Sequence, residues 1–547
     1  MKFKKLLLSL FLIFSFLLTA CGNTQNTEKT STSSNKLKDV EILNVGTIRE
    51  FNTANFSGDL MQYLGFENFC FSNPIRITND YKVVPSFAES YTVSDDNKSI
   101  IFTIPTNAKW HDGQPVTAED FKFSIDYCLN VLKTMKTYFK SCEIIDNKTV
   151  KVNLVNTSPI VALRQWTLCN RTVLLPKHIW ENVSDPKTYQ GEGSMVGCGP
   201  YKFDHYDKDA KIAYFDAFED YHLGKPSVKK IAFKLYENKE SVLMALKNKE
   251  IDCFYQYSSG FTGQYANAIN NLEGYDPGLV EDMGVPVLTF NMKDDKRIDL
   301  KVREAIYYSL DYKLLASTLG QGYADIAGKG IVSPSNIGYD SSLPINEQNI
   351  KKANELLDTA GYKDINNDGF RETPDGKEFK QLITPQQSQS LGNMYDRLSQ
   401  IIVKDLKNIG INAYIDEEVI GNNEKYKNRI KSNEFDIHLL STTSGANFID
   451  TPFKYFPTER TGYFGGTLSD PEFLKLYSGL LDSTNMNEYE DYVRKLQNYA
   501  VKNIPCIALG WDKLFFPYNT EKFEGWIMKN GVGAFNYESL FNLKEIE

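Results

Sequence analysis

Residues 110–121 read Trp-His-Asp-Gly-Gln-Pro-Val-Thr-Ala-Glu-Asp-Phe and join a loop to the start of a helix. The glycine and proline in the first half favour a shaped loop, because glycine accepts positive φ and proline fixes φ near −65°. Thr117, followed three residues later by Asp120, is a capping-box pattern that marks a helix N-terminus. Residues 98–105, Lys-Ser-Ile-Ile-Phe-Thr-Ile-Pro, predict a strand just before the loop. We therefore expect strand, loop and helix in direct succession.

Apolar side chains recur at helical spacing after this cap and at two later places in the chain. The three predicted faces consist of Phe121, Ile125, Cys128 and Leu132; of Val302, Ile306 and Leu310; and of Ile350, Ala353, Leu356, Leu357 and Ala360. Gly361 is expected to end the third helix, since glycine commonly follows a helix C-terminus. Strand-like segments alternate with such helices along the chain, which predicts mixed α/β domains.

The first residues have the features of an export signal. Three lysines at positions 2, 4 and 5 precede a largely apolar run over 6–18, which is short for a permanent membrane span. Residues 18–21, Leu-Thr-Ala-Cys, resemble the lipobox of bacterial lipoproteins. This resemblance implies removal of a signal peptide over 1–20 and a lipid on Cys21. The polar residues that follow predict a flexible tether over 21–36. The alternative is an ordinary signal peptide with an incidental cysteine.

Composition limits the possible partners. The chain has 547 residues and a net charge of −9, with 61 Lys and Arg against 70 Asp and Glu. Nucleic-acid binding depends on Lys and Arg contacts to phosphates, so this balance argues against it. The length predicts two or three domains. No later apolar run reaches membrane-spanning length, so we expect an extracytoplasmic body held to the cell membrane by its lipid alone.

The cysteines do not suggest a metal site. Apart from Cys21, seven remain, and no two form a C-x-x-C pair. Zinc and iron–sulfur sites need clustered thiolates or histidines, which this spacing does not offer. We expect small buried thiols, with one or two disulfides left open, and no cofactor or metal.

Six motifs along the chain resemble those of one protein family. They occupy residues 85–91, 110–121, 197–201, 241–246 with 250–252, 302–306 with 310–311, and 354–362. They are similar to motifs of the family 5 solute-binding proteins, the peptide-, dipeptide- and nickel-binding lipoproteins of bacterial ABC transporters. The resemblance implies an α/β, two-lobed, periplasmic-binding-protein-like fold of cluster C type, with an extra subdomain in the first lobe.

The resemblance also implies how the chain is divided. Lobe I is expected from residues 37–73, 195–286 and 512–547, and an inserted subdomain of lobe I from residues 74–194. Lobe II is expected from residues 287–511. The segments 287–291 and 506–511 are apolar and strand-like, and we expect them to form the paired hinge of lobe closure.

No catalytic motif is apparent in the sequence. The five histidines are scattered, and neither an H-E-x-x-H nor a G-x-S-x-G motif is present. The chain is therefore not expected to be an enzyme. Residues 364–369 with Asp375 resemble a calcium loop, but position 12 is Asp rather than Glu, and the sequence favours a turn over a calcium site.

Aromatic residues and one carboxylate are the expected ligand contacts. The predicted binding residues are Phe51, Tyr255, Asn447, Phe448, Asp450, Tyr463 and Trp511. A buried peptide ammonium needs a carboxylate, and in peptide-binding relatives an Asp follows a strand like residues 435–440. Asp450 is the nearest match here, with a helix cap before Pro452 as its alternative role. The partner of the ligand carboxylate is left open, with Lys454 and Arg460 as candidates.

These observations predict a lipid-anchored receptor that captures small peptides by lobe closure. The implied partners are the permease subunits of an ABC importer with their ATPase, and the receptor is expected to be a monomer. Alternatives are a nickel chelate or another small solute as cargo, and a signalling lipoprotein. The sequence leaves open the peptide length and side-chain preference and the cognate permease.

Overall fold

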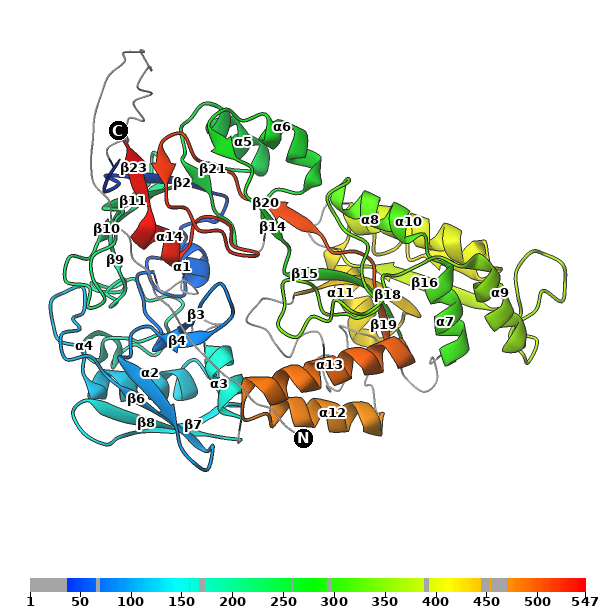
Figure 1. Ribbon diagram of the computed structural model, residues 1–547, viewed down its shortest axis with the longest axis horizontal. Helices are drawn as coiled ribbons and strands as arrows, with labels where there is room; N and C mark the ends of the chain where they lie inside the picture. Colours follow the sequence, from blue (N-terminus) through cyan, green and yellow to red (C-terminus); the bar gives the residue numbers. More distant parts are fainter. Residues whose placement is uncertain are drawn as a thin grey trace, which may run out of the picture.

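Three larger sheets organise the computed structural model, and each gathers different parts of the chain (Figure 1). The structure describes residues 37–64, 69–156, 158–166, 173–257, 259–292, 298–387, 393–443, 453 and 470–547. The predicted signal peptide, Cys21 and the tether therefore lie outside the described residues. The described part contains no helix with the length and apolar composition needed to cross a bilayer.

A seven-stranded sheet forms the core of lobe I. Its order is β13 (Tyr275–Asp276), β21 (Tyr518–Asn519), β12 (Cys253–Phe254), β2 (Leu43–Thr47), β11 (Lys230–Leu235), β10 (Ile212–Ala217) and β9 (Tyr201–Asp207). The accompanying helices are α1 (Asp59–Leu64), α5 (Lys239–Lys247), η3 (Gly263–Tyr265), α6 (Ala266–Asn270) and α14 (Tyr537–Asn542). A small sheet pairs both chain ends, in the order β1 (Leu37–Lys38), β23 (Lys544–Ile546) and β22 (Phe523–Glu524).

The inserted subdomain contains a four-stranded antiparallel sheet and a hairpin. The sheet order is β5 (Ser90–Val93), β6 (Ser99–Thr103), β8 (Thr149–Leu154) and β7 (Phe139–Ile144), and the hairpin pairs β3 (Ile75–Ile77) with β4 (Val83–Pro85). Its helices are α2 (Ala118–Asn130), α3 (Pro159–Trp166) and α4 (Lys177–Trp180). The predicted strand, loop and helix are confirmed, and Thr117 forms the capping box with Asp120.

The motif at 110–121 is structural, because its histidine fastens two loops. His111 is surrounded by protein, which lowers its pKa to about 4 and keeps the ring neutral. Its Nε2–H donates to the carbonyl of Gly199 (3.0 Å), and its Nδ1 accepts the N–H of Gly197 (3.3 Å). A Cβ on Gly199 would lie 2.0 Å from the carbonyl oxygen of Phe69, so only glycine fits there.

Lobe II is built on a five-stranded mixed sheet. Its order is β17 (Asn412–Ile415), β16 (Lys380–Pro385), β18 (Ile437–Thr443), β15 (Gly284–Phe290) and β19 (Cys506–Ala508). The helices are α7 (Leu300–Ser309), α8 (Tyr312–Gly320), α9 (Ile350–Thr359), α10 (Met394–Lys407), α11 (Asn423–Ser432), α12 (Pro471–Leu481) and α13 (Met486–Asn503). The predicted helices at 300 and 350 are confirmed, and Gly361 follows the second with φ +88°.

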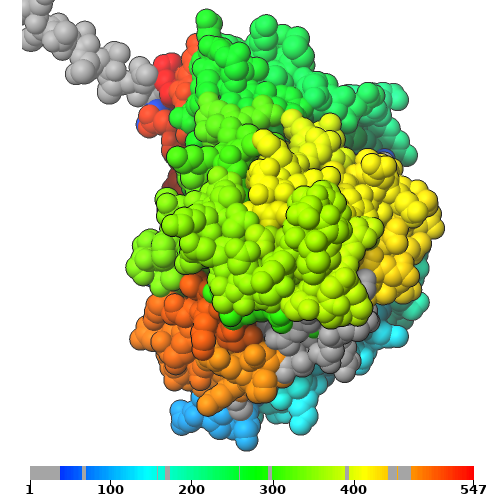
Figure 2. Space-filling view, turned by 90° about the vertical axis from the view of Figure 1, so that its right-hand side faces the viewer, coloured from blue at the N-terminus to red at the C-terminus, as the bar shows by residue number. Residues whose placement is uncertain are grey.

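Each body has its own buried apolar cluster, as separately packed units do. Tyr127 and Trp180 of the inserted subdomain pack into the lobe I cluster, which fixes the subdomain to that lobe. In Figure 2 lobe II covers most of the visible face, and the inserted subdomain emerges below α12 and α13. Six cysteines in the described residues are buried: Cys70, Cys128, Cys142, Cys198, Cys253 and Cys506.

The calcium-like loop forms hydrogen-bonded turns. The carboxylate of Asp364 accepts the N–H of Gly369 (3.0 Å), and Asp368 accepts the N–H of Phe370 (2.8 Å). Asp375, at position 12 of the motif, forms an ion pair with Lys377 (2.7 Å). These contacts use the oxygens that a calcium ion would need, and they fit the turn interpretation.

Two chain crossings join the lobes, at the centre of Figure 1. The strand β14 (Leu279–Glu281) pairs with β20 (Lys513–Phe515) beside lobe I, whereas β15 and β19 pair within the lobe II sheet. The first crossing therefore lies at Asp282 and Met283, earlier than the predicted hinge segment 287–291, of which residues 287–290 belong to β15. The second crossing lies between β19 and β20, at residues 509–512, and so overlaps the end of the predicted hinge segment 506–511. The other domain boundaries stay predictions.

Candidate functional site

The crossings meet the end of β18, where the predicted ligand loop begins. Gly284, the first residue of β15, pairs with Thr443, the last residue of β18. The chain after Thr443 therefore starts beside the first crossing. Asn447, Phe448, Asp450 and Tyr463, together with Lys454 and Arg460, lie outside the described residues, so their roles stay predictions.

The other three predicted contacts lie in packed surroundings. Tyr255 is 2% exposed and packs against the ring of Phe535, with centroids 5.0 Å apart. Trp511 is 4% exposed, and its backbone pairs with that of Asp325. Phe51 is half-buried and contacts aromatic rings of β9. In this conformation Tyr255 and Trp511 are packed against other residues and expose little surface that a ligand could contact. Their contact with a ligand stays a prediction.

Each crossing carries a carboxylate at the point where the chain changes lobe. The N–H of Asp282 donates to the carbonyl of Asp512 (2.9 Å), so the two crossings are joined directly. One oxygen of Asp282 accepts the N–H of Gly284 (3.1 Å), and one oxygen of Asp512 accepts the N–H of Lys513 (2.8 Å). Among the described residues, neither carboxylate has an ion-pair partner within 4.0 Å.

The surroundings make both carboxyl groups hold protons more tightly. Desolvation raises the pKa of Asp512 to about 7, and the charge of Asp282 raises it further. Desolvation also raises the pKa of Asp282 to about 6, which the nearby Lys239 opposes. Lys239 is desolvated too, and its pKa falls to about 8; its Nζ donates to the carbonyl of Gly260 (2.7 Å). The hinge thus holds two carboxyl groups that titrate near neutral pH.

Other groups around this pair are already partnered. Lys513 forms ion pairs with Asp325 (2.7 Å) and Glu281 (3.8 Å). Tyr395 on α10 lies near Ser441 and both hinge carboxylates, and burial raises the pKa of its hydroxyl. These contacts hold lobe II against the crossings without neutralising either Asp.

A hydrogen-bonded chain ties the inserted subdomain to the same hinge. The hydroxyl of Tyr81, in the β3–β4 turn, donates to the carbonyl of Ser335 in lobe II (2.7 Å). The Ser335 hydroxyl in turn donates to the carbonyl of Asp282 (3.0 Å). Tyr81 has φ +64°, a left-handed conformation that costs a non-glycine residue about 1 kcal/mol or more. The inserted subdomain is therefore joined to lobe II and to the hinge through the side chains of Tyr81 and Ser335, and Tyr81 lies on a strained backbone.

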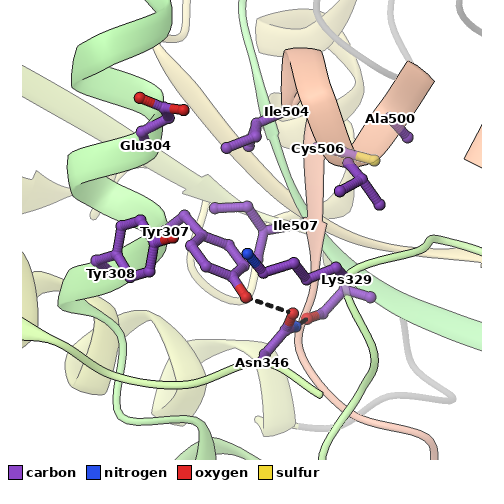
Figure 3. A pocket seen from close by; sticks show the side chains of 11 residues that line it. Glu304, Tyr307, Tyr308, Lys329, Asn346, Ala500, Ile504, Cys506 and Ile507 are labelled. Carbon is purple, nitrogen blue, oxygen red and sulfur yellow. Dashed lines mark hydrogen bonds between the residues drawn. The ribbon is translucent and has the colours of Figure 1, made fainter. Parts of the chain in front are cut away.

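A small cavity in lobe II is structural rather than ligand-binding. It lies between α7, α13 and β19, and its volume is about 50 Å³, enough for very few water molecules (Figure 3). The hydroxyl of Tyr307 donates to Asn346 (3.0 Å), whose amide donates to the carbonyl of Ala508 (2.8 Å). Lys329 lies over the rings of Tyr307 and Tyr308, 5.0 and 5.6 Å from their centroids. These contacts fasten α7 to β19.

The hinge carboxylates and Tyr81 were not predicted from the sequence. Asp282 and Asp512 are separated by more than two hundred residues of sequence, and no local pattern marks either. Tyr81 lies in an ordinary turn sequence, Asn-Asp-Tyr-Lys, with no glycine to signal its positive φ. The nearest sequence signal was the apolar character of the strands on either side of the crossings.

Comparison with known proteins gives a consistent result. The model of the "Bacterial extracellular solute-binding proteins, family 5 Middle" matches residues 82–463. The oligopeptide-binding protein AppA of Bacillus subtilis (strain 168) is 26% identical over 419 residues, which cover 74% of each chain.

Two solved structures have the same fold. AppA from Bacillus subtilis in complex with a nonapeptide has a TM-score of 0.67 at 22% identity, covering 94% of this chain and 100% of that one. NikZ from Campylobacter jejuni in complex with Ni(L-His) also has a TM-score of 0.67 at 22% identity, covering 92% and 99%. Both likenesses support the two-lobed fold, and neither settles the solute.

Proposed function

Because this chain belongs to the bacterial extracellular solute-binding proteins of family 5, we propose that it captures small peptides and delivers them to an ABC permease. Members of this family are binding proteins rather than enzymes. The observation that carries the peptide proposal is the similarity to an oligopeptide-binding protein over three quarters of the chain. The cargo is released unchanged, so the chemistry is that of binding alone.

The geometry at the crossings supports capture by closure. Two lobes joined by two short adjacent segments can rotate about them while each core stays packed. Thr443, the last residue of β18, pairs with Gly284 at this hinge, which supports a ligand position between the lobes. A solute shifts the equilibrium to the closed state by the difference in its contacts with the two states.

The proposal includes the cellular setting. Residues 1–20 act as a signal peptide, and the lipid on Cys21 holds a monomeric receptor at the outer face of the cell membrane. The tether lets the body move between solution and the permease with its ATPase. Metabolic labelling with a fatty-acid probe tests the anchor: Cys21→Ser should abolish labelling and release the protein, whereas Cys70→Ser should not.

Native mass spectrometry of residues 22–547, purified under mild conditions, tests the cargo. Peptides that co-purify and are displaced on mild unfolding would support the proposal. A folded protein that binds no member of a mixed di- to nonapeptide library by calorimetry would refute it.

A metal chelate is the second candidate solute. The NikZ complex with Ni(L-His) has the same TM-score and sequence identity to this chain as the AppA complex. A co-purified nickel–chelator mass in the same experiment would favour this candidate. Uptake assays in a strain lacking the gene separate either transport function from a signalling role, because a pure signalling lipoprotein would leave peptide and nickel uptake unchanged.

A further inference from the structure

A pocket of about 870 Å³ lies between the inserted subdomain and lobe II. One wall consists of the β3–β4 turn and α3, and the other consists of residues 334–339 and one face of α13. Figure 1 shows α3 and the start of α13 close together, and Figure 2 shows the inserted subdomain below α12 and α13. The volume suits a small ligand or one to several peptide residues.

This pocket differs from four others formed by the described residues, each of which lies within one body. Those four are the cavity of Figure 3, a pocket along α5 and α6, one on α11 and one beside α2. A solute that stabilises the closed state must contact both sides of the cleft. The pocket between the inserted subdomain and lobe II meets this requirement.

The two walls are held together by hydrogen bonds across the junction. The Tyr81 hydroxyl donates to Ser335, and the Ser158 hydroxyl at the start of α3 donates to the carbonyl of Ser483 (2.7 Å). Rotation of lobe II away from lobe I would separate both pairs. The pocket therefore depends on closure, and a molecule bound in it favours the closed state by linkage.

The floor and walls of the pocket are largely apolar and aromatic. The apolar lining includes Val83, Tyr91, Leu163, Ile337, Tyr339 and Met486. Burying one aliphatic side chain of a ligand here contributes about 1.5–3 kcal/mol. Apolar surface of this kind is typical of sites that recognise side chains by shape.

The charges in the pocket favour an anion. It is lined by three cations, Lys82, Arg164 and Arg494, and by two carboxylates, Asp80 and Glu490, within a chain of net charge −9. Lys82 and Asp80 pair closely (2.6 Å), whereas Arg494 and Glu490 lie 3.8 Å apart.

Arg164 places a guanidinium in the wall of the pocket with 1% of the residue exposed. Its Nη2 donates to two uncharged groups, the carbonyl of Tyr81 (2.5 Å) and the sulfur of Met486 (3.5 Å). Guanidinium groups in low-dielectric surroundings bind carboxylates more strongly than exposed lysines do.

We infer that this pocket receives the carboxyl-terminal residue of the bound peptide, with its carboxylate beside Arg494 and Arg164 and an apolar side chain against Ile337 and Tyr339. This inference rests on the proposed function, and it names the group that recognises the ligand carboxylate. It replaces Lys454 and Arg460 in that role. The expected ligands are peptides with a free carboxyl terminus and an apolar last residue.

Calorimetry on the purified full chain tests the inference with two tetrapeptide mixtures. Both have randomised first three positions and end in leucine, one as the free acid and the other as the amide. We expect the free acid to bind about tenfold more tightly, because a charge-assisted hydrogen bond is lost in the amide. Arg494→Gln should reduce the ratio of free-acid affinity to amide affinity to about two. Lys495→Gln changes the neighbouring exposed cation, which pairs with Asp491, and should keep the wild-type ratio.

A third mixture that ends in glycine tests the apolar wall. It should bind several-fold more weakly than the leucine acid, and Ile337→Ala should remove most of that difference. If acid and amide bind equally well to the wild-type chain, the inference is overturned while the proposed function stands. If a folded chain binds none of the mixtures, both are overturned. The inference would also be refuted if Arg494→Gln and Lys495→Gln reduced the preference for the free acid over the amide equally.

Discussion

Replacing Asp512 with Asn should stabilise the protein in a pH-dependent way. The pKa of this carboxyl group is about 7 in the folded protein against an ordinary value of 3.8, and the group is 7% exposed. The folded state therefore holds the proton more tightly than the unfolded chain. The stability linked to this proton is complete below about pH 4 and is lost as the pH rises through about 7.

The size of the effect follows from the same two values. A difference of roughly three pH units, at 1.36 kcal/mol each, corresponds to about 4 kcal/mol by which the charged carboxylate disfavours the folded state above pH 7. Asn carries no charge at any pH. Asp512→Asn should therefore recover a large part of this lost folding stability, about 2 kcal/mol or more. At pH 4 the variant and the wild type should be equally stable, because both side chains are then neutral in the folded protein.

Thermal unfolding followed by circular dichroism between pH 4 and pH 9 checks this prediction. The variant should melt at a higher temperature than the wild type at pH 8 and at the same temperature at pH 4. Asp491→Asn, which changes an exposed carboxylate on α13, is the matched control and should leave the pH profile nearly unchanged. An Asp512→Asn protein that melts with the wild type at pH 8, or is stabilised equally at both pH values, would refute the reasoning.

Three further predictions concern the inserted subdomain, the ligand loop and the packing of Gly199 in lobe I. Tyr81→Phe removes the hydroxyl that donates to Ser335 and should destabilise the closed state by about 1 kcal/mol. Small-angle scattering should then show a larger open fraction, and ligand release should be faster. Unchanged release would contradict this prediction. Asp450→Asn should weaken binding of amine-bearing peptides by about 2 kcal/mol in calorimetry but spare N-acetylated peptides. Gly199→Ala should prevent accumulation of folded protein, because its Cβ would overlap the carbonyl of Phe69; normal yield and melting would show that the backbone can shift.

Local structure could be predicted wherever one residue dictates the backbone. Thr117 with Asp120 identified the start of α2, and Gly361 identified the end of α9, because caps act within a few residues. The motifs then identified the family and hence the two-lobed fold. The position of the first crossing was misjudged, because residues 284–290 are apolar except for Thr289 and give no sign of where a strand enters a sheet.

The site was less predictable, for physical reasons. Aromatic residues line both cores and clefts, and the sequence did not reveal that Tyr255 and Trp511 are almost fully buried. The pocket between the inserted subdomain and lobe II collects segments around residues 82, 162, 336 and 490, which only the tertiary fold brings together. A buried arginine such as Arg164 has no local pattern, since its environment comes from other elements.

The pairing of the two chain ends in lobe I has a consequence for biogenesis. β21 lies between β12 and β13, and β23 pairs with β1, so the lobe I sheets need residues from both ends of the chain. Lobe II uses one continuous stretch and can form while the last residues are still being synthesised. Lobe I must wait for the final strands. Such an order of assembly keeps the nascent polypeptide from completing its fold early, which suits the proposed export of an unfolded chain.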